Sequence, residues 1–147
     1  MNEIIIYTIG FTKKSAQDFF RSITDAGVKK LVDIRLNNAS QLAGFAKRDD
    51  LAYFLKELCN CDYLHEPLLA PTQQILDAYK KGGIDWIEYE SRFNALIRDR
   101  KIENRFNTSE LDMSCFLCSE PTPDKCHRRL VSEYLKRKLG NIIIQHL

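Results

Sequence analysis

Two short motifs near the C-terminal end of the sequence combine side chains that could do chemistry. Cys118-Ser119-Glu120 directly follows an apolar run, and Cys126-His127-Arg128 opens a segment with helical periodicity. A cysteine in the first turn of a helix is favoured as a thiolate, because the free backbone N–H groups and the helix dipole stabilise negative charge. A neighbouring carboxylate or imidazole could move a proton in such a site. The candidate catalytic residues are therefore Cys118, Glu120, Cys126 and His127.

Other interpretations of these motifs compete with catalysis. Cys126 could be an inert buried cysteine, and Glu120 could cap the helix or pair with Arg128. Cys115 and Cys118, with the Cys126-His127 pair, superficially offer four soft metal ligands. However, Cys115 and Cys118 lie three residues apart on an expected strand, so their side chains should point to opposite faces. We therefore predict no metal and no cofactor here.

Further polar residues that could bind a ligand follow two apolar runs near the N-terminal end. Thr8 and Gly10 end the first run, and a glycine there lets the backbone approach a ligand closely. Asp33 and Arg35 end the second run, and their spacing of two places them on one face of a strand. The planar guanidinium of Arg35 or Arg128 suits a carboxylate or phosphate. The alternative for Asp33 and Arg35 is a structural ion pair.

The loop after Arg35 is rich in neutral polar side chains. Amide side chains carry both a donor and an acceptor, which suits the recognition of a base or a sugar. A turn-rich connector is the alternative interpretation. The loop adds four candidate ligand-binding residues, which are Asn37, Asn38, Ser40 and Gln41.

These residues must be positioned by strands that alternate with helices. Strands are expected over residues 4–9, 30–35, 62–65, 113–118 and 142–144, and a solvated loop over 102–111. Helices are expected to begin near Ser15, Asp49 or Asp50, Thr72, Asp85 and Asp124. This alternation predicts one α/β domain over residues 1–147, with a mostly parallel five-stranded sheet and helices on both faces.

We predict a three-layer, Rossmann-like or flavodoxin-like architecture with the strand order 3-2-1-4-5. Right-handed crossovers place all strands in one sheet, with their carboxyl ends at one edge. The candidate residues after strands one, two and four then converge at that edge. Parallel sheets bind ligands there, close to the point where the strand order reverses.

The composition argues against several classes of protein. The 147 residues carry a net charge of +2, which is too small to indicate nucleic-acid binding by itself. No segment approaches the ~18 consecutive apolar residues that span a bilayer, so no membrane partner is expected. The apolar run after the N-terminus is too short for an export signal. The five cysteines are therefore expected as thiols in a reducing cytoplasm.

Five of these segments together resemble a known protein family. They are Thr8-Ile9-Gly10, Val32-Asp33-Ile34-Arg35, Tyr63-x-His65, Leu117-Cys118-Ser119-Glu120 and Cys126-His127-Arg128. In this order they resemble the family catalogued as domain of unknown function 488, and the last two segments are the most specific. The resemblance implies an α/β sandwich-like fold and a bacterial or archaeal cytosolic protein. It implies no established reaction.

Two kinds of function and one structural alternative follow from these residues. The first is an enzyme that acts on a small anionic or nucleotide-like substrate, in which guanidinium groups bind the anion, a thiol attacks, and Glu120 or His127 moves protons. The second is a non-enzymatic binding module for a nucleotide or a nucleic acid. The amide-rich loop and five basic residues motivate it, namely Lys47, Arg48, Lys125, Arg128 and Arg129. The third is a cluster of Cys, His and Arg side chains that only stabilises the fold.

Overall fold

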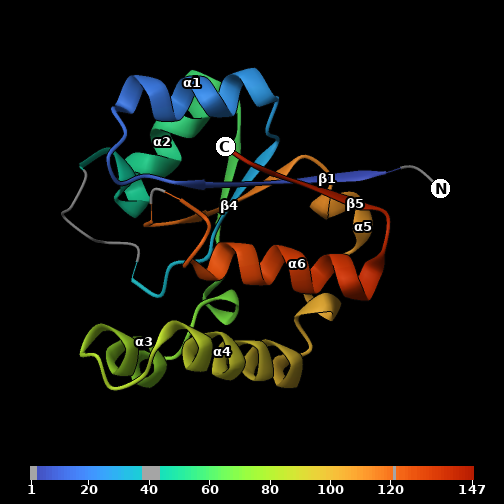
Figure 1. Cartoon of the computed structure of the whole chain (residues 1–147). Coiled ribbons are helices and arrows are strands. Elements are labelled where there is room, and N and C mark those ends of the chain that lie inside the picture. Colours follow the sequence, from blue (N-terminus) through green and yellow to red (C-terminus); the bar gives the residue numbers. More distant parts are fainter. Residues whose placement is uncertain (1–2, 38–43, 121) are drawn as a thin grey trace.

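The computed structural model describes residues 3–37, 44–120 and 122–147, and these form a parallel sheet with helices on both faces (Figure 1). The five strands of the sheet all run in the same direction. They are β1 (Ile4–Gly10), β2 (Lys30–Asp33), β3 (Asp62–His65), β4 (Ser114–Cys118) and β5 (Ile142–His146). The predicted α/β class is therefore confirmed.

The strand order is β3-β2-β4-β1-β5, so the predicted order 3-2-1-4-5 is wrong at its centre. β4 lies between β2 and β1, and Leu117 is in register with Asp33 on one side and with Ile9 on the other. Every residue of β4 is buried, whereas Ile4 and Ile5 at the start of β1 are only partly buried. Both strands are continuous apolar runs in the sequence, and such runs do not reveal which strand is central.

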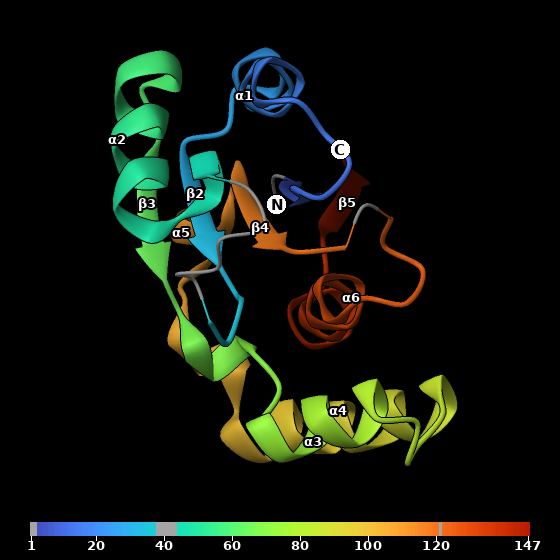
Figure 2. The ribbon, with the colours of Figure 1, turned by 90° about the vertical axis from the view of Figure 1, so that its left-hand side faces the viewer.

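Helices cover the two faces of the sheet (Figure 2). On one face, α1 (Ala16–Ala26) packs beside α2 (Arg48–Cys59). On the other face, α6 (His127–Leu139) lies against the sheet, α4 (Trp86–Arg100) packs on α6, and α3 (Gln73–Lys80) lies beside α4. Each face has its own apolar core. None of the helices within the described ranges is long and apolar enough to cross a membrane.

Side-chain caps begin three of these helices where the sequence predicts. The hydroxyl of Ser15 accepts a hydrogen bond from the N–H of Asp18 at the start of α1. Thr72 caps α3 and Asp85 caps α4 in the same way. The start of α6 differs from the prediction near Asp124, because the helix begins at His127 with Cys126 as its N-cap.

The segment 102–111 is not the solvated loop that its polar composition predicts. It contains the 3-10 helix η3 (Ile102–Arg105) and the short helix α5 (Thr108–Leu111). Ile102 and Leu111 are fully buried in the core on the α6 side of the sheet. Phe106 also packs against this core, so three apolar side chains anchor a stretch whose other side chains are polar. Two more 3-10 helices are η1 (Gly44–Ala46) and η2 (Pro67–Leu69).

Candidate functional site

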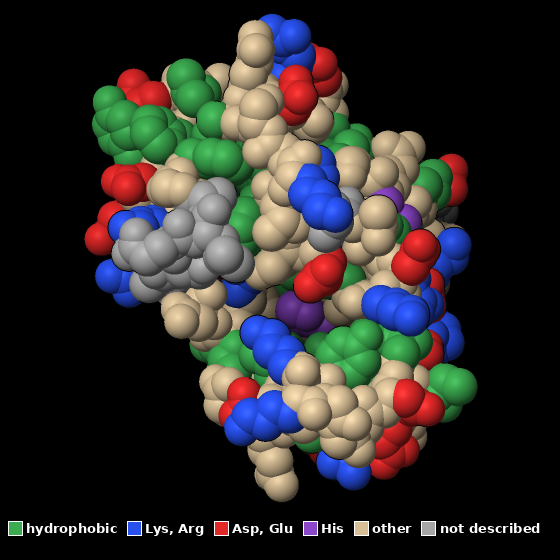
Figure 3. All heavy atoms as spheres, turned by 60° about the vertical axis from the view of Figure 1, so that its left-hand side comes forward, with side chains coloured by type: hydrophobic (Ala, Val, Ile, Leu, Met, Phe, Trp, Pro, Cys, Tyr) green, Lys and Arg blue, Asp and Glu red, His purple; other side chains and the backbone are tan. Residues whose placement is uncertain are grey.

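A cavity of about 280 Å³ opens at the carboxyl ends of β2 and β4, beside the first turn of α6. Figure 3 shows one face of the molecule on which histidine, acidic and basic side chains lie next to apolar ones. Six residues singled out from the sequence line the cavity, namely Arg35, Asn37, Cys118, Glu120, Cys126 and His127. The structure thus brings the end of β2, the end of β4 and the start of α6 together at one edge of the sheet.

Asp33 and Arg35 form a buried ion pair behind the cavity wall. Both guanidinium-to-carboxylate contacts are short, with Nε to Oδ1 at 2.8 Å and Nη2 to Oδ2 at 2.7 Å. The hydroxyl of Tyr63 also donates a hydrogen bond to Oδ2 of Asp33 at 2.6 Å, and Nη2 of Arg35 also donates to the carbonyl of Ala46 at 2.7 Å. Asp33 is fully buried and does not line the cavity. It holds the guanidinium of Arg35 in one orientation, as the structural alternative predicts.

Gly10 is needed for close packing, but the neighbour is protein rather than a ligand. A Cβ atom on Gly10 would lie 1.6 Å from the carbonyl oxygen of Glu120 and 2.4 Å from Nη1 of Arg128. Thr8, also buried, bonds through its hydroxyl to Nδ1 of His146 at 2.5 Å. Neither Thr8 nor Gly10 lines the cavity. The structure therefore places both residues in packing and hydrogen bonding within the fold, and their predicted role in ligand binding stays a prediction.

Arg128 is the largest fully buried side chain among the described residues. Its Nη1 donates to the carbonyl oxygen of Glu120 at 2.8 Å, which connects α6 to the segment after β4. Within the described part of the chain, Nε and Nη2 of Arg128 have no hydrogen-bond partner. Burial lowers the pKa of this guanidinium below its ordinary value. Glu120 is exposed, and its backbone carbonyl rather than its carboxylate accepts the hydrogen bond from Arg128.

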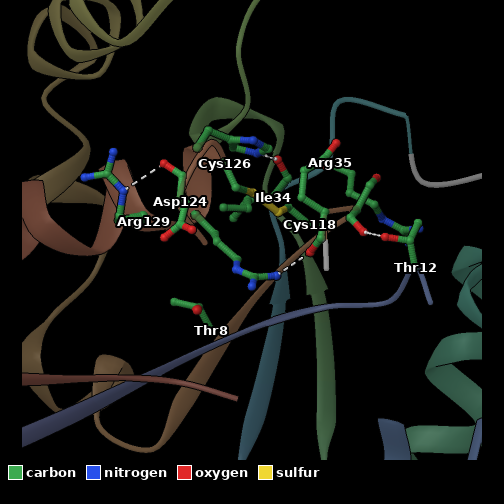
Figure 4. Close-up of a disulfide and its surroundings, with 12 residues drawn as sticks. Thr8, Thr12, Ile34, Arg35, Cys118, Asp124, Cys126 and Arg129 are labelled. Atoms are coloured by element: carbon green, nitrogen blue, oxygen red, sulfur yellow. Dashed lines mark hydrogen bonds between the residues drawn. A yellow bond between two sulfur atoms is a disulfide. The ribbon is translucent and has the colours of Figure 1, made fainter. Parts of the chain in front are cut away.

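His127 is fixed in one orientation and one tautomer. Its Nε2 lies 2.7 Å from the carbonyl oxygen of Ile34 (Figure 4). A carbonyl can only accept, so Nε2 carries the proton and Nδ1 is left as the basic nitrogen. Burial lowers the pKa of His127 to about 4, which outweighs the opposing effect of this hydrogen bond. The imidazole is therefore neutral at pH 7.

Cys118 and Cys126 form a disulfide at the cavity wall (Figure 4). The prediction that all five cysteines are thiols is therefore wrong for this pair. The reason is that the end of β4 and the N-cap of α6 meet, although eight residues separate the two cysteines. Cys115 is a free thiol in the core on the α1 side of the sheet, whereas Cys118 packs on the α6 side. The prediction that these two residues face opposite sides is confirmed.

The sequence analysis missed an aromatic wall and one cation around the cavity. They are Tyr79, Trp86, Tyr89 and Lys80. Lys125, one of the basic residues behind the binding-module hypothesis, also lines the cavity. The rings of Trp86 and Tyr89 stack with centroids 4.9 Å apart and an interplanar angle of 19°. The helical spacing of Trp86, Tyr89 and Phe93 predicts that all three side chains lie in the core. Phe93 is fully buried there, whereas Trp86 and Tyr89 also line the cavity. The Gly-Gly turn at 82–83 is the sequence signal that α3 and α4 fold back on each other.

The remaining residues from the sequence analysis are His65 and three residues of the amide-rich loop. His65 does not line the cavity, and its Nε2 lies 2.8 Å from the carbonyl oxygen of Arg35, so it supports the segment that follows β2. Asn38, Ser40 and Gln41 fall in the range 38–43, which lies outside the described residues. Of the amide-rich loop, the structure therefore places Asn37 at the cavity.

Comparison with known proteins identifies the family of this chain. The model of the family described as Domain of unknown function DUF488 matches residues 15–135. Among curated proteins and solved structures, no match was found. The matched range includes every residue that the structure and the sequence analysis both place at the cavity. Because the match extends over most of its length, the chain belongs to the DUF488 family.

Proposed function

We propose that this protein is an enzyme that binds a small nucleotide-like ligand, with a flat ring and an anionic group, in the cavity at the carboxyl ends of β2 and β4. One observation carries the proposal. A single cavity of about 280 Å³ combines a wall of stacked aromatic rings with cationic side chains and proton-transfer groups. This volume is near the lower end of the range of about 300–1,000 Å³ typical of small-molecule sites. A mononucleotide-sized ligand therefore fits better than a polymer.

The ring of the ligand would lie against the aromatic wall. Trp86 stacks on Tyr89, and Tyr79 contacts both rings, with centroids 5.8 Å from Trp86 and 5.1 Å from Tyr89. Base-to-aromatic stacking contributes about 1–3 kcal/mol per base and tolerates different bases. The wall thus supports binding of a flat ring without specifying which ring.

The anionic group would lie on the basic side of the cavity. Arg35 reaches the lining with its orientation set by Asp33, and its Nη1 is a buried donor without a hydrogen-bond partner within the described part of the chain. Lys80 and Lys125 are exposed and line the same cavity. The free N–H groups at the start of α6 add a favourable field for an anion. These features support a phosphate or carboxylate more strongly than a neutral group.

The chemistry proposed for this site is proton transfer next to a sulfur pair. The exposed carboxylate of Glu120 and the neutral imidazole of His127 are both within the cavity lining. A carboxylate and a neutral imidazole can each accept a proton at pH 7. Cys118 or Cys126 would serve as a nucleophile only in the reduced protein, because a disulfide sulfur has no thiolate to attack with. A reducing, cytoplasmic setting is therefore part of this proposal.

A non-enzymatic binding module is the second candidate. The disulfide between Cys118 and Cys126 favours it, because the oxidised pair offers binding surface but no nucleophile. The two candidates predict different fates for a bound ligand. An enzyme converts the ligand when the pair is reduced, whereas a binding module returns it unchanged under both oxidising and reducing conditions.

The single tryptophan of the chain gives a direct test of ligand binding. Trp86 lines the cavity, so its fluorescence should change when a ring stacks beside it. We expect adenosine monophosphate to change the signal at lower concentration than either adenosine or inorganic phosphate, because only the nucleotide uses both halves of the cavity. Lys125→Gln should weaken nucleotide binding roughly fivefold through the lost attraction for the anion.

Lys136→Gln is the matched control, because Lys136 is exposed on α6 but does not line the cavity. This variant should bind as the wild type does. If a panel of purine and pyrimidine nucleotides leaves both the fluorescence and the melting temperature of the wild type unchanged, the proposed ligand class is wrong.

A further inference from the structure

Three soft metal-ligating side chains meet at the wall of the cavity. The ligand atoms of Cys118, Cys126 and His127 all lie within 4.8 Å of one another. The sequence argument against a metal rested on Cys115, which lies on the opposite face of the sheet and is not part of this cluster. Two cysteine sulfurs and one imidazole nitrogen are a ligand set that suits Zn²⁺. We propose that the reduced protein binds one zinc ion through Cys118, Cys126 and His127, with the fourth coordination position open to the cavity.

The spacing of the cluster is close to what a tetrahedral zinc centre needs. Zinc-to-sulfur bonds of about 2.3 Å and zinc-to-nitrogen bonds of about 2.0–2.1 Å place the ligand atoms roughly 3.5–3.8 Å from one another. The three atoms already fall within 4.8 Å. Once the disulfide is reduced, the two sulfurs must move apart to accept the metal, and rotation of the cysteine side chains supplies that movement.

The backbone holds the two cysteines far enough apart to admit an ion. Their Cα atoms are 7.6 Å apart, whereas most disulfides join Cα atoms about 4.4–6.8 Å apart. β4 fixes one cysteine and the N-cap of α6 fixes the other. The wider spacing leaves room for a metal between the two sulfurs.

The hydrogen bond of His127 is the kind that supports a metal ligand. Histidines that bind metals usually donate their second ring N–H to a backbone carbonyl or a carboxylate, which fixes the ring and its tautomer. Nε2 of His127 makes this contact with the carbonyl oxygen of Ile34 at 2.7 Å. Nδ1 is then the nitrogen with a free lone pair, and the ring is also held by edge contact with Phe93, centroid to centroid at 5.6 Å.

The position of the cluster indicates a site that keeps one coordination position open. Three protein ligands and one open position are typical of catalytic zinc, whereas structural zinc has four protein ligands. Cys118, Cys126 and His127 all line the cavity, so water or an anionic ligand can reach the fourth position. In the zinc-bound protein the two thiolates and Nδ1 of His127 are metal ligands, so Glu120 remains as the proton acceptor and a cysteine nucleophile belongs to the reduced, metal-free form.

Reduction and metal binding balance as two separate steps. A phosphine reductant and one water convert the disulfide to two thiols and a phosphine oxide. Zinc then replaces the two thiol protons, which are released to solvent, and the two thiolates neutralise the charge of the ion. An oxidant that closes the disulfide again would expel the metal.

Cobalt(II) is the probe for this site, because it takes the same ligands as zinc and is coloured. We expect the phosphine-reduced wild type to bind one cobalt ion per chain, with a thiolate-to-cobalt charge-transfer band and the visible bands of a tetrahedral centre. Addition of zinc should remove the colour. Cys118→Ser and Cys126→Ser should each abolish the charge-transfer band or reduce it to that of a single thiolate.

Cys59→Ser is the matched control, because Cys59 is a free cysteine in a different part of the fold and carries no role in the cluster. This variant should bind cobalt as the wild type does. Circular dichroism checks that each variant is folded. If the cysteine variants do not fold, the cobalt titration of the wild type still tests whether the site binds a metal. A reduced, folded wild type that binds no cobalt and no zinc overturns the proposal.

Metal content is measured without any organic ligand, so this test is separate from the nucleotide titration. A wild type that binds metal but no nucleotide would refute the proposed function and leave the zinc site standing. A wild type that binds nucleotide but no metal would do the reverse.

Discussion

Replacing Gly10 by alanine should severely destabilise the protein, although alanine adds only one methyl group. The new Cβ would lie 1.6 Å from the carbonyl oxygen of Glu120 and 2.6 Å from its carbonyl carbon. To bring the oxygen contact to 3.0 Å, the two segments must separate by about 1.4 Å. The opposing atoms belong to the backbone, so a change of rotamer cannot relieve the clash. The separation would also lengthen the hydrogen bond from Arg128 to the carbonyl of Glu120.

The magnitude follows from the cost of overpacking a buried position. Extra methylene groups in a well-packed core cost about 1–3 kcal/mol and occasionally more. We place Gly10→Ala at the upper end of this range, about 3 kcal/mol. The backbone must move, and the hydrogen bond from the buried guanidinium of Arg128 to Glu120 is weakened. For a chain of this length, 1 kcal/mol shifts the melting temperature by about 2–4 °C. The expected decrease is therefore about 6–12 °C, measured by circular dichroism and by urea unfolding.

Gly44→Ala is the control for this prediction. Among the described residues, a Cβ atom on Gly44 would meet nothing within 4 Å, and its backbone is not in the left-handed region. We expect its free energy of unfolding to stay within about 0.5 kcal/mol of the wild type. If Gly10→Ala melts within 2 °C of Gly44→Ala, at about the precision of the assay, the packing of β1 against Glu120 is not as tight as the structure places it.

Three other perturbations test different parts of the fold. Asp33→Ala leaves the buried guanidinium of Arg35 without its carboxylate, and we expect a loss of about 3–5 kcal/mol in chemical unfolding; equal stability would show that the ion pair is dispensable. Cys61 and Cys115 should resist iodoacetamide in the native state and react after unfolding. Burial raises the pKa of Cys61 to about 12 and raises that of Cys115 further. Mass spectrometry of the labelled peptides checks this, and rapid native labelling of either thiol would contradict it. Ile102→Ala should lower the free energy of unfolding by about 2–5 kcal/mol, because Ile102 is fully buried. An unchanged melting temperature would instead support a solvated loop over 102–111.

Local signals in the sequence predict most of the elements but not the order of the strands. Caps such as Ser15, Thr72 and Asp85 act on the nearest backbone N–H groups, so short-range patterns are sufficient to locate these helix starts. The exchange of β1 and β4 at the centre of the sheet depends on burial from both faces. Burial is a property of the assembled fold, and residues 4–9 and 114–118 are both apolar runs that satisfy either position.

The residues of the candidate site also fall into those that the sequence could predict and those that depend on the assembled fold. Residues that follow strands could be predicted to meet, because the carboxyl ends of parallel strands share one edge whatever the strand order. This holds for Arg35, Cys118 and Cys126. The exposure of Trp86 to the cavity could not be predicted, because it depends on how α4 packs on α6. The pairing of Cys118 with Cys126 likewise depends on a distance that the sequence does not contain.

The place of β4 in the sheet has a consequence for how the chain acquires its structure during synthesis. Of the five described strands, β1 is made before the others, and its partners among them are β4 and β5, which lie in the final third of the sequence. The oldest strand must therefore remain without a neighbour until residues beyond 113 have been made. Such long-range pairing is slow and exposes apolar strand edges in the meantime. A ribosome stalled before β4 would carry a nascent chain whose first strand is available to chaperones and to other unfinished chains.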